Sequence, residues 1–279
     1  MKVSLWGTRG SLPEAGLPTV RYGGNTSCVT IEGSGGQLLV LDAGSGIRRF
    51  GTGLDPDIRE VHILLTHLHM DHIQGLGFFK PLFSPTARMH IWGPPSTTMD
   101  LRERLGRYLS PPLFPVLIRD LPCDLVLHDT PRGEFRIGEF AITADLICHP
   151  GPTLGYRITD NGSSMAYLPD HEPSLGRDGL EEPRDWISGC SLARGVDLLI
   201  HDAQYTEDEY DSHAGWGHSS IRDAIAFASI AQVARMVAFH HDPAREDAEI
   251  DRITQEATRA YQPRFELVAG EEGAVFEIA

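Results

Sequence analysis

The stretch Thr66-His67-Leu68-His69-Met70-Asp71-His72 follows directly on the apolar run Val61–Leu65. A short apolar run of this kind predicts a buried strand, so we expect the histidine-rich stretch to form a loop at its carboxyl end. His67 and His69 stand two positions apart in an extended segment and therefore point the same way, toward one metal ion. Asp71 and His72 come after the chain has begun to turn, so they point elsewhere and can bind a second metal ion. Imidazole and carboxylate are ligands of catalytic zinc, with manganese or iron as competitors.

Further candidate ligands stand where other predicted strands end, which is where sheet-based sites collect side chains. They are His149 after residues 141–148, Asp170 after residues 163–168, and His240 after residues 235–239. A single His or Asp at a strand end is more often a cap or a turn residue. Together with the first cluster, however, these three complete a ligand set for two metal ions.

The bulk composition predicts one compact soluble body. The 279 residues suit one large domain or two modest ones, and no linker or repeat divides them, so we take residues 1–279 as a single domain. The four cysteines are widely spaced without a Cys-x-x-Cys pair, which favours reduced thiols in a cytosol. Met1–Gly7 is too short for a signal peptide and no later segment approaches a membrane span, so we expect a cytoplasmic protein without a membrane partner. The formal net charge of −15 argues against a long duplex or a folded RNA as a partner.

Strands and helices are expected to interleave, which predicts mixed sheets covered by helices. In addition to the strand before the histidine loop, predicted strands are 2–6, 27–32, 37–41, 88–92, 135–147 with a kink near Gly138, 153–159, 163–168, 196–200, 235–239, 265–268 and 274–278. Predicted helices are a short one after 42–46, a helical turn at 73–79, 96–108 with Ser96 as its cap, one that begins in a capping box at Ser220–Asp223, and 245–261.

On these residues the chain resembles the metallo-β-lactamase-fold hydrolase superfamily, whose signature is His-x-His-x-Asp-His after a core strand. The likeness runs from the opening strands through Leu41–Gly44 to Phe239-His240. It implies an α/β (α+β) fold, a four-layer αβ/βα sandwich of two mixed β-sheets flanked by helices, with two divalent metal ions at one edge. Zn²⁺ is the expected metal, with Mn²⁺ or Fe²⁺ as alternatives.

The resemblance also implies a ligand assignment: metal one takes His67, His69 and His149, metal two takes Asp71, His72 and His240, and Asp170 bridges both. We prefer His240 to the adjacent His241 because the family's ligand stands directly after the strand. Position 69 is His rather than Glu, which excludes the redox-active diiron members. Asp170 stands where the commonest antibiotic-hydrolysing members have Cys, which excludes them. Thioester hydrolases of the glyoxalase type keep the same ligands and stay open.

A second pattern resembles the phosphodiesterase branch that includes tRNase Z, in which an acid pairs with the histidine of a Gly-His-Ser-Thr-like motif. Asp202 in Leu198–Ala203 matches the acid, and His218 in Gly217–Ser220 matches the histidine. A carboxylate can orient and charge an imidazole that protonates a departing alkoxide. A Gly-His-Ser that merely caps a helix is the alternative, and the metal set favours the catalytic role. We therefore group Asp71, Asp202 and His218 as catalytic residues.

The expected function is hydrolysis of a small phosphodiester, such as a cyclic nucleotide, by a hydroxide between two metal ions. Residues 21–27 and 201–205 look like bacterial relatives described as cyclic-nucleotide phosphodiesterase-like, and no Lys/Gly-rich arm like that of the tRNA-processing members is visible. A tRNase Z-like ribonuclease acting on RNA ends is the alternative. A metal-binding sensor or scaffold without turnover is an alternative of another class. The sequence does not indicate the number of subunits, and a homodimer is one alternative.

Three further features also have expected roles. Asp42 is expected to support a ligand or a loop rather than to bind metal. His171 faces either the cleft or the surface. The loop Thr8–Arg21 carries Arg9 and Arg21, and it either closes over a phosphate or is a solvated loop.

Overall fold

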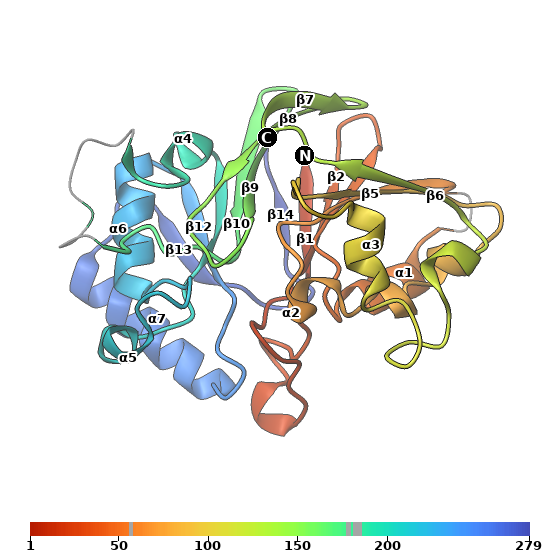
Figure 1. The fold of residues 1–279 in the computed structure, drawn as a ribbon. Coiled ribbons are helices and arrows are strands. Elements are labelled where there is room, and N and C mark those ends of the chain that lie inside the picture. Colours follow the sequence, from red (N-terminus) through yellow and green to blue (C-terminus); the bar gives the residue numbers. More distant parts are fainter. Residues whose placement is uncertain (56–57, 177–179, 181–185) are drawn as a thin grey trace.

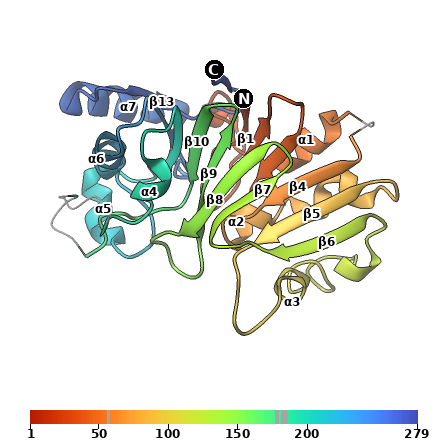
Figure 2. The same cartoon turned by 90° about the horizontal axis from the view of Figure 1, so that it is seen from above.

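Two β-sheets face each other, and helices cover the outer side of each (Figures 1 and 2). The computed structural model describes residues 1–55, 58–176, 180 and 186–279, and within these residues each sheet has seven strands. The order of layers is helix, sheet, sheet, helix. This arrangement confirms the predicted four-layer αβ/βα sandwich.

The elements have the following bounds. The first sheet has the order β14 (Val275–Glu277), β1 (Lys2–Gly7), β2 (Cys28–Glu32), β3 (Leu38–Leu41), β4 (Glu60–Leu64), β5 (Arg88–Gly93) and β6 (Asp124–Asp129). The second has the order β13 (Glu266–Ala269), β12 (Arg235–Phe239), β11 (Leu198–Asp202), β10 (Ser163–Leu168), β9 (Leu154–Asp160), β8 (Phe140–Leu146) and β7 (Gly133–Ile137). The helices are α1 (Ile47–Gly53), α2 (Met70–Ile73), α3 (Leu101–Gly106), α4 (Cys190–Ala193), α5 (Glu207–His213), α6 (Ile221–Ala231) and α7 (Asp247–Tyr261). Short 3₁₀ turns occur at Leu17–Thr19, Leu76–Phe78, Lys80–Phe83 and Ile118–Asp120.

Both sheets mix parallel and antiparallel pairs. Strands β3 to β6 are parallel to one another, and so are β10 to β13. Polar side chains follow the carboxyl ends of β4, β10, β11 and β12, the ends where sheet proteins commonly bind ligands. The topology thus gathers residues that are far apart in the sequence.

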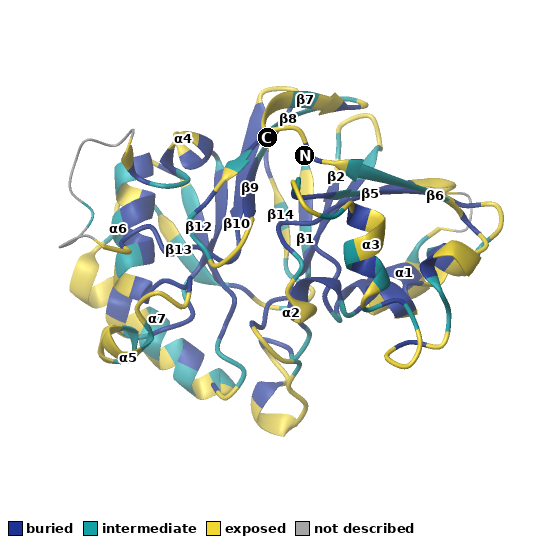
Figure 3. Cartoon of the chain, in the orientation of Figure 1, coloured by how far each residue is buried: buried dark blue, intermediate teal, exposed yellow. Residues whose placement is uncertain are grey.

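One large apolar core lies between the sheets and joins residues such as Leu5 and Ile31 of the first to Phe140 and Tyr156 of the second. Separate cores lie under the helices. In α6 the residues Ala224, Phe227 and Ala228 recur at helical spacing, face β11 and β12, and are buried. Figure 3 shows that α6 has both buried and more exposed residues. Burial of a side chain such as Phe227 contributes about 1.5–3 kcal/mol. These packed layers hold the strand ends in fixed positions.

The last strand of the chain pairs with the first. β14 pairs antiparallel with β1, and the amino group of Met1 donates to the carbonyl of Ile278 at 2.9 Å. That closure favours a single domain over residues 1–279, which stays a prediction. Within the described residues, no helix is both long and apolar enough to cross a membrane.

Several predicted elements differ from the structure. The helix expected at 96–108 spans only Leu101–Gly106, because Asp100 and Glu103 form a capping box and start it later than Ser96 would. Gly138 has a φ of +52° and reverses the chain, so the strand predicted at 135–147 is the hairpin β7–β8. The predicted helical turn at 73–79 is α2 followed by a 3₁₀ turn. Ser220 caps α6 by accepting from the Asp223 amide, whereas the Asp223 carboxylate accepts from Ser174. Strand β6 and helices α4 and α5 were not predicted.

Candidate metal centre

The histidine loop turns from extended to helical within a few residues. His69 is the extended N-cap residue of α2, with φ −66° and ψ 153°, and the helix begins at Met70. His67 and His69 precede this turn, whereas Asp71 and His72 lie on the helix. The change of direction divides the four side chains into two pairs.

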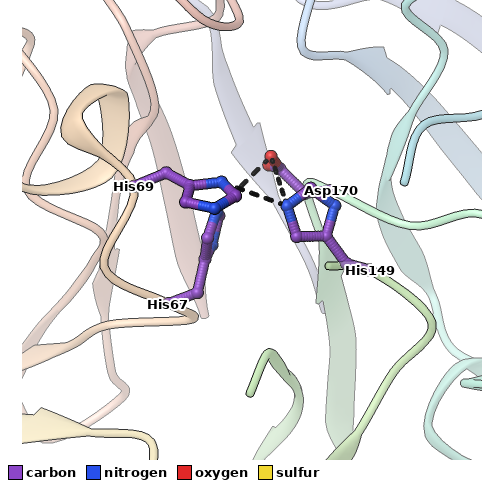
Figure 4. A group of neighbouring side chains, drawn as sticks. All are labelled: His67, His69, His149 and Asp170. Atoms are coloured by element: carbon purple, nitrogen blue, oxygen red, sulfur yellow. Dashed lines mark hydrogen bonds and ion pairs between the residues drawn. The ribbon is translucent and has the colours of Figure 1, made fainter. Parts of the chain in front are cut away.

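The first group consists of His67, His69, His149 and Asp170, whose ligand atoms all lie within 4.8 Å of one another (Figure 4). The Nε2 atoms of His67 and His149 lie 3.7 and 3.8 Å from Asp170 Oδ2. His149 Nε2 is 3.2 Å from His69 Nδ1. His67 and His69 follow β4 of the first sheet, whereas His149 and Asp170 follow β8 and β10 of the second, so both sheets contribute.

The second group consists of Asp71, His72, Asp170 and His240. Asp170 Oδ1 is 3.0 Å from His72 Nε2 and 3.3 Å from His240 Nε2. Asp71 Oδ2 is 3.3 and 3.1 Å from the same two nitrogens. Asp170 therefore presents one oxygen to each group, which is the geometry that a bridging carboxylate needs. The structure brings all seven predicted ligands together, and their assignment as ligands stays a prediction.

Each histidine of the two groups except His69 has its second ring nitrogen occupied by an outer partner. His72 Nδ1 donates to Asp42 at 2.8 Å, and His149 Nδ1 donates to the Gly217 carbonyl at 2.8 Å. His240 Nδ1 is 2.9 Å from Gln204 Oε1, and His67 Nδ1 is 3.0 Å from the Thr66 hydroxyl. Such contacts fix the tautomer that leaves Nε2 with a lone pair, as metal binding requires.

Asp42 is linked by hydrogen bonds, directly or through Thr66, to residues of both ligand groups. It is fully buried and accepts from the Thr66 amide and hydroxyl, from His72 and from the Tyr167 hydroxyl. Since Thr66 in turn contacts His67, this one carboxylate orients a histidine of each group. The structure places Asp42 in the supporting position expected for it.

The donor set fits two divalent cations. Three buried atoms that face the centre, His67 Nε2, His72 Nε2 and Asp170 Oδ1, make no hydrogen bond of good geometry within the described residues, although His72 Nε2 and Asp170 Oδ1 lie 3.0 Å apart. Buried polar atoms normally have partners, so their convergence indicates a ligand. Oxygen and imidazole nitrogen donors of this kind suit a divalent metal ion.

The electrostatics agree with cation binding. Burial would raise the pKa of Asp170, but the facing rings of His240, His72 and His67 hold it well below its usual range. Burial lowers the pKa of His67, so this ring is neutral and able to ligate. Burial also disfavours charge on His72, yet Asp170, Asp71 and Asp42 raise its pKa well above the ordinary value. These carboxylates attract positive charge, and a metal ion replaces the proton when it binds.

Asp202 and His218 form a hydrogen-bonded pair beside the second group. His218 Nδ1 donates to Asp202 Oδ2 at 2.7 Å, and Asp202 Oδ1 accepts from the amides of Gln204 and Ser219. The His218 ring stacks on His240 with 4.8 Å between centroids. Burial opposes its charge, but Asp202 raises the pKa of His218 to about 9. The imidazole is therefore protonated near neutral pH, with Nε2 left to deliver a proton.

The structure also gives the positions of four residues for which the sequence left alternatives open. His241 points away from the centre and donates to the Gly270 carbonyl, whereas His240 lies in it. His171 is neither in the cleft nor on the surface, because it is fully buried and shares a 2.9 Å hydrogen bond with His201. Arg9 is fully buried and donates to the carbonyls of Gly23, Asp242 and Arg245, so it holds loops together and cannot bind phosphate. Arg21 pairs with Asp251 on α7.

The loop Thr8–Arg21 nevertheless reaches the centre through its backbone. The Ser11 amide donates to Asp71 Oδ2 at 2.7 Å, and a Cβ on Gly10 would lie 2.3 Å from the His240 ring. The loop therefore positions predicted ligands of the second group.

The sequence analysis missed Glu172, a fully buried acid two residues after Asp170. Its carboxylate accepts from the amides of Gly215 and Gly217, at 2.7 and 2.8 Å, and from the Tyr210 hydroxyl. Gly217 has a φ of +91°, and a Cβ there would lie 2.2 Å from His149 Nδ1. Glu172 thus fixes the loop whose carbonyl orients His149 and whose next residue is His218.

We expect Glu172→Gln to weaken zinc affinity about 10- to 100-fold, because the amide group turns a donor toward the Gly215 or Gly217 N–H and releases the loop. The loss of stability should be about 1–3 kcal/mol. Competition with a chelator measures the affinity, and Tyr210→Phe, which leaves both glycine contacts, is the control. A lowered Tm with unchanged zinc affinity would mean that Glu172 supports the fold alone.

The comparison with known families decides the relationship. A family model described as "Beta-lactamase superfamily domain" matches residues 39–241. The chain belongs to the beta-lactamase superfamily. This span contains every predicted ligand together with Asp202 and His218.

Two relatives show the range of similarity. A Ribonuclease Z of Myxococcus xanthus is 27% identical over 82% of this chain and 85% of its own length. An uncharacterized protein of Mycobacterium bovis, Mb1374, is 31% identical over 75% of this chain and 72% of its own.

Solved structures show the same fold. The metallo-beta-lactamase fold protein YhfI of Bacillus subtilis has a TM-score of 0.71 and 20% identity, with 99% of each chain covered. The short form of human tRNase Z has a TM-score of 0.68 and 21% identity over the whole of both chains.

Proposed function

We propose that this protein hydrolyses a small phosphodiester, such as a cyclic nucleotide, with two divalent metal ions, most readily Zn²⁺. Its general class is that of a metal-dependent phosphodiester hydrolase. The observation that carries the proposal is the Asp202–His218 pair beside two ligand groups that share Asp170. A site that only stores or senses metal does not require a proton donor, whereas hydrolysis does, and His218 is a buried proton donor next to the ligand groups.

The ligand groups divide the work of holding the metals. His67, His69 and His149 would hold one ion, Asp71, His72 and His240 the other, and Asp170 would contact both. Two such ions lower the pKa of a water molecule and polarise a phosphoryl oxygen. Asp42, Gln204 and Gly217 keep the rings in position, so little reorganisation is required when substrate arrives.

His218 supplies the proton for the leaving alkoxide. Asp202 fixes its Nδ1, so the proton on Nε2 is the one that leaves. Asp202 itself is held by two backbone amides and does not rotate away. General acid catalysis of this kind contributes about 10²–10⁴-fold in rate.

Charge favours a small substrate over a folded RNA. The chain has a formal charge of −15, and the loop at Thr8–Arg21 presents no basic surface, because Arg9 is buried and Arg21 is paired with Asp251. Ribonuclease Z relatives, at 27% identity, keep the processing of RNA ends as the second candidate. Cytoplasmic location and a homodimer are further proposals.

A substrate panel on zinc-loaded protein tests this proposal. We expect turnover of cyclic nucleotides and linear dinucleotides to exceed that of a tRNA precursor and of a thioester. Preference for the tRNA precursor would replace the proposal with the ribonuclease. Cleavage of the thioester alone would replace it with a thioester hydrolase, and no turnover of any substrate would favour the sensor or scaffold.

A further inference from the structure

A groove of about 520 Å³ opens beside the first ligand group. Its walls come from the loop after β4, from α3 and the segment that follows, and from the loop after β8. His67 and His69 form part of one wall, so a molecule in the groove touches the centre. The volume lies within the range of about 300–1,000 Å³ typical of small-ligand sites.

The lining is mainly apolar. Its apolar residues include Leu68, Met70, Tyr108, Leu113 and Pro152. Two of these side chains are exposed to solvent, Leu113 at 71% and Met70 at 51%. Apolar side chains left exposed around a concave site mark a place where an apolar ligand binds.

The charged residues of the lining, other than the predicted ligands, are the arginines Arg104 and Arg107. None of the described residues that line the groove is acidic, although the chain has 39 acidic residues. Arg104 is held by the Pro94 carbonyl and by Asp129 at 3.6 Å. Arg107 is exposed and has no ion pair within the described part of the chain. The groove therefore suits an apolar group attached to an anion.

The proposed proton donor, His218, lies outside the groove. His218 contacts His149 and His240 and is not part of the groove lining. Because His218 must reach the leaving oxygen, the leaving alcohol lies on the His218 side. The groove is then free for the ester group that stays on phosphorus.

We propose that this groove binds a planar aromatic group on the retained side of the phosphodiester, with Arg107 beside the ring. The inference rests on the proposed function, because it takes the reaction as phosphodiester hydrolysis. Ring burial against Leu113 and Met70 supplies the affinity, and the arginine adds a cation next to the ring face. Substrates that retain a small alkyl group leave the groove empty.

The test compares two diesters with the same leaving group, phenyl 4-nitrophenyl phosphate and methyl 4-nitrophenyl phosphate. We expect a KM about tenfold lower for the phenyl ester on zinc-loaded protein, in line with the 10- to 200-fold that apolar pockets discriminate. Leu113→Ser should reduce this ratio to about threefold or less. Leu17→Ser, which changes a leucine that is 91% exposed and lies outside the groove, is the matched control and should leave it unchanged.

Binding of the two monoester products, phenyl phosphate and methyl phosphate, gives a readout without turnover. Calorimetry on zinc-loaded protein should show tighter binding of phenyl phosphate, and Leu113→Ser should remove the difference. Equal KM values for the diesters, or a ratio that Leu113→Ser does not change, would overturn the groove assignment. If neither diester is hydrolysed while phenyl phosphate binds selectively, the proposed function fails and the groove stands. Absence of both turnover and selective binding would remove both.

Discussion

Asp170→Ala is expected to reduce the metal content from about two ions per chain to less than one, and to lower phosphodiester turnover by more than about 10³-fold. The reason is geometric, because Oδ2 faces His67 and His149 while Oδ1 faces His72 and His240. Both positions lose a ligand in one substitution. The imidazoles that remain lose the negative charge that draws a cation to them.

Elemental analysis of the purified variant measures this loss, together with turnover of a nitrophenyl diester. Asp160→Asn is a suitable control, since Asp160 is also buried but binds Ser34 in a turn far from the centre. It should keep both metals. A fully loaded and active Asp170→Ala protein would overturn the bridging assignment.

His218→Ala is expected to keep both metals and the fold while losing about 10²–10⁴-fold in turnover of substrates with alkyl leaving groups. A nitrophenolate leaving group needs little protonation, so turnover of a nitrophenyl ester should fall much less. Asp202→Asn should show the same pattern more mildly, because it removes the charge that raises the His218 pKa and leaves the imidazole in place.

His213→Ala provides a control histidine on α5, where His213 contacts the Glu209 carbonyl rather than either ligand group. It should match the parent on both substrates. Equal losses of His218→Ala on both substrate types, or release of a metal ion, would mean that His218 ligates metal or shapes the pocket.

The residues of the two ligand groups could be named from the sequence because their signals are local. A histidine two positions from another, or an acid directly after an apolar strand, is visible without a fold, and the strand order then brings these ends together. The division of the loop into two pairs followed from the change between strand and helix periodicity at Met70.

Other features depend on long-range contacts that no local pattern contains. Glu172 is partnered with backbone amides 43 and 45 residues away, so nothing near it in the sequence indicates its role. Arg9 carries a charge that suggests phosphate binding, but its carbonyl partners lie up to 236 residues away and bury it. Two possible helix caps close together in the sequence also led to a wrong helix start, since the capping box at Asp100 begins α3 later than Ser96 would.

The most direct test of the account is turnover of a phosphodiester by metal-free protein as zinc is added back in known amounts. The account predicts no turnover without metal and a rise that reaches its plateau at about two ions per chain, since both ligand groups are needed. Full turnover by the metal-free protein, or a protein that binds two zinc ions and hydrolyses no phosphodiester, would contradict it.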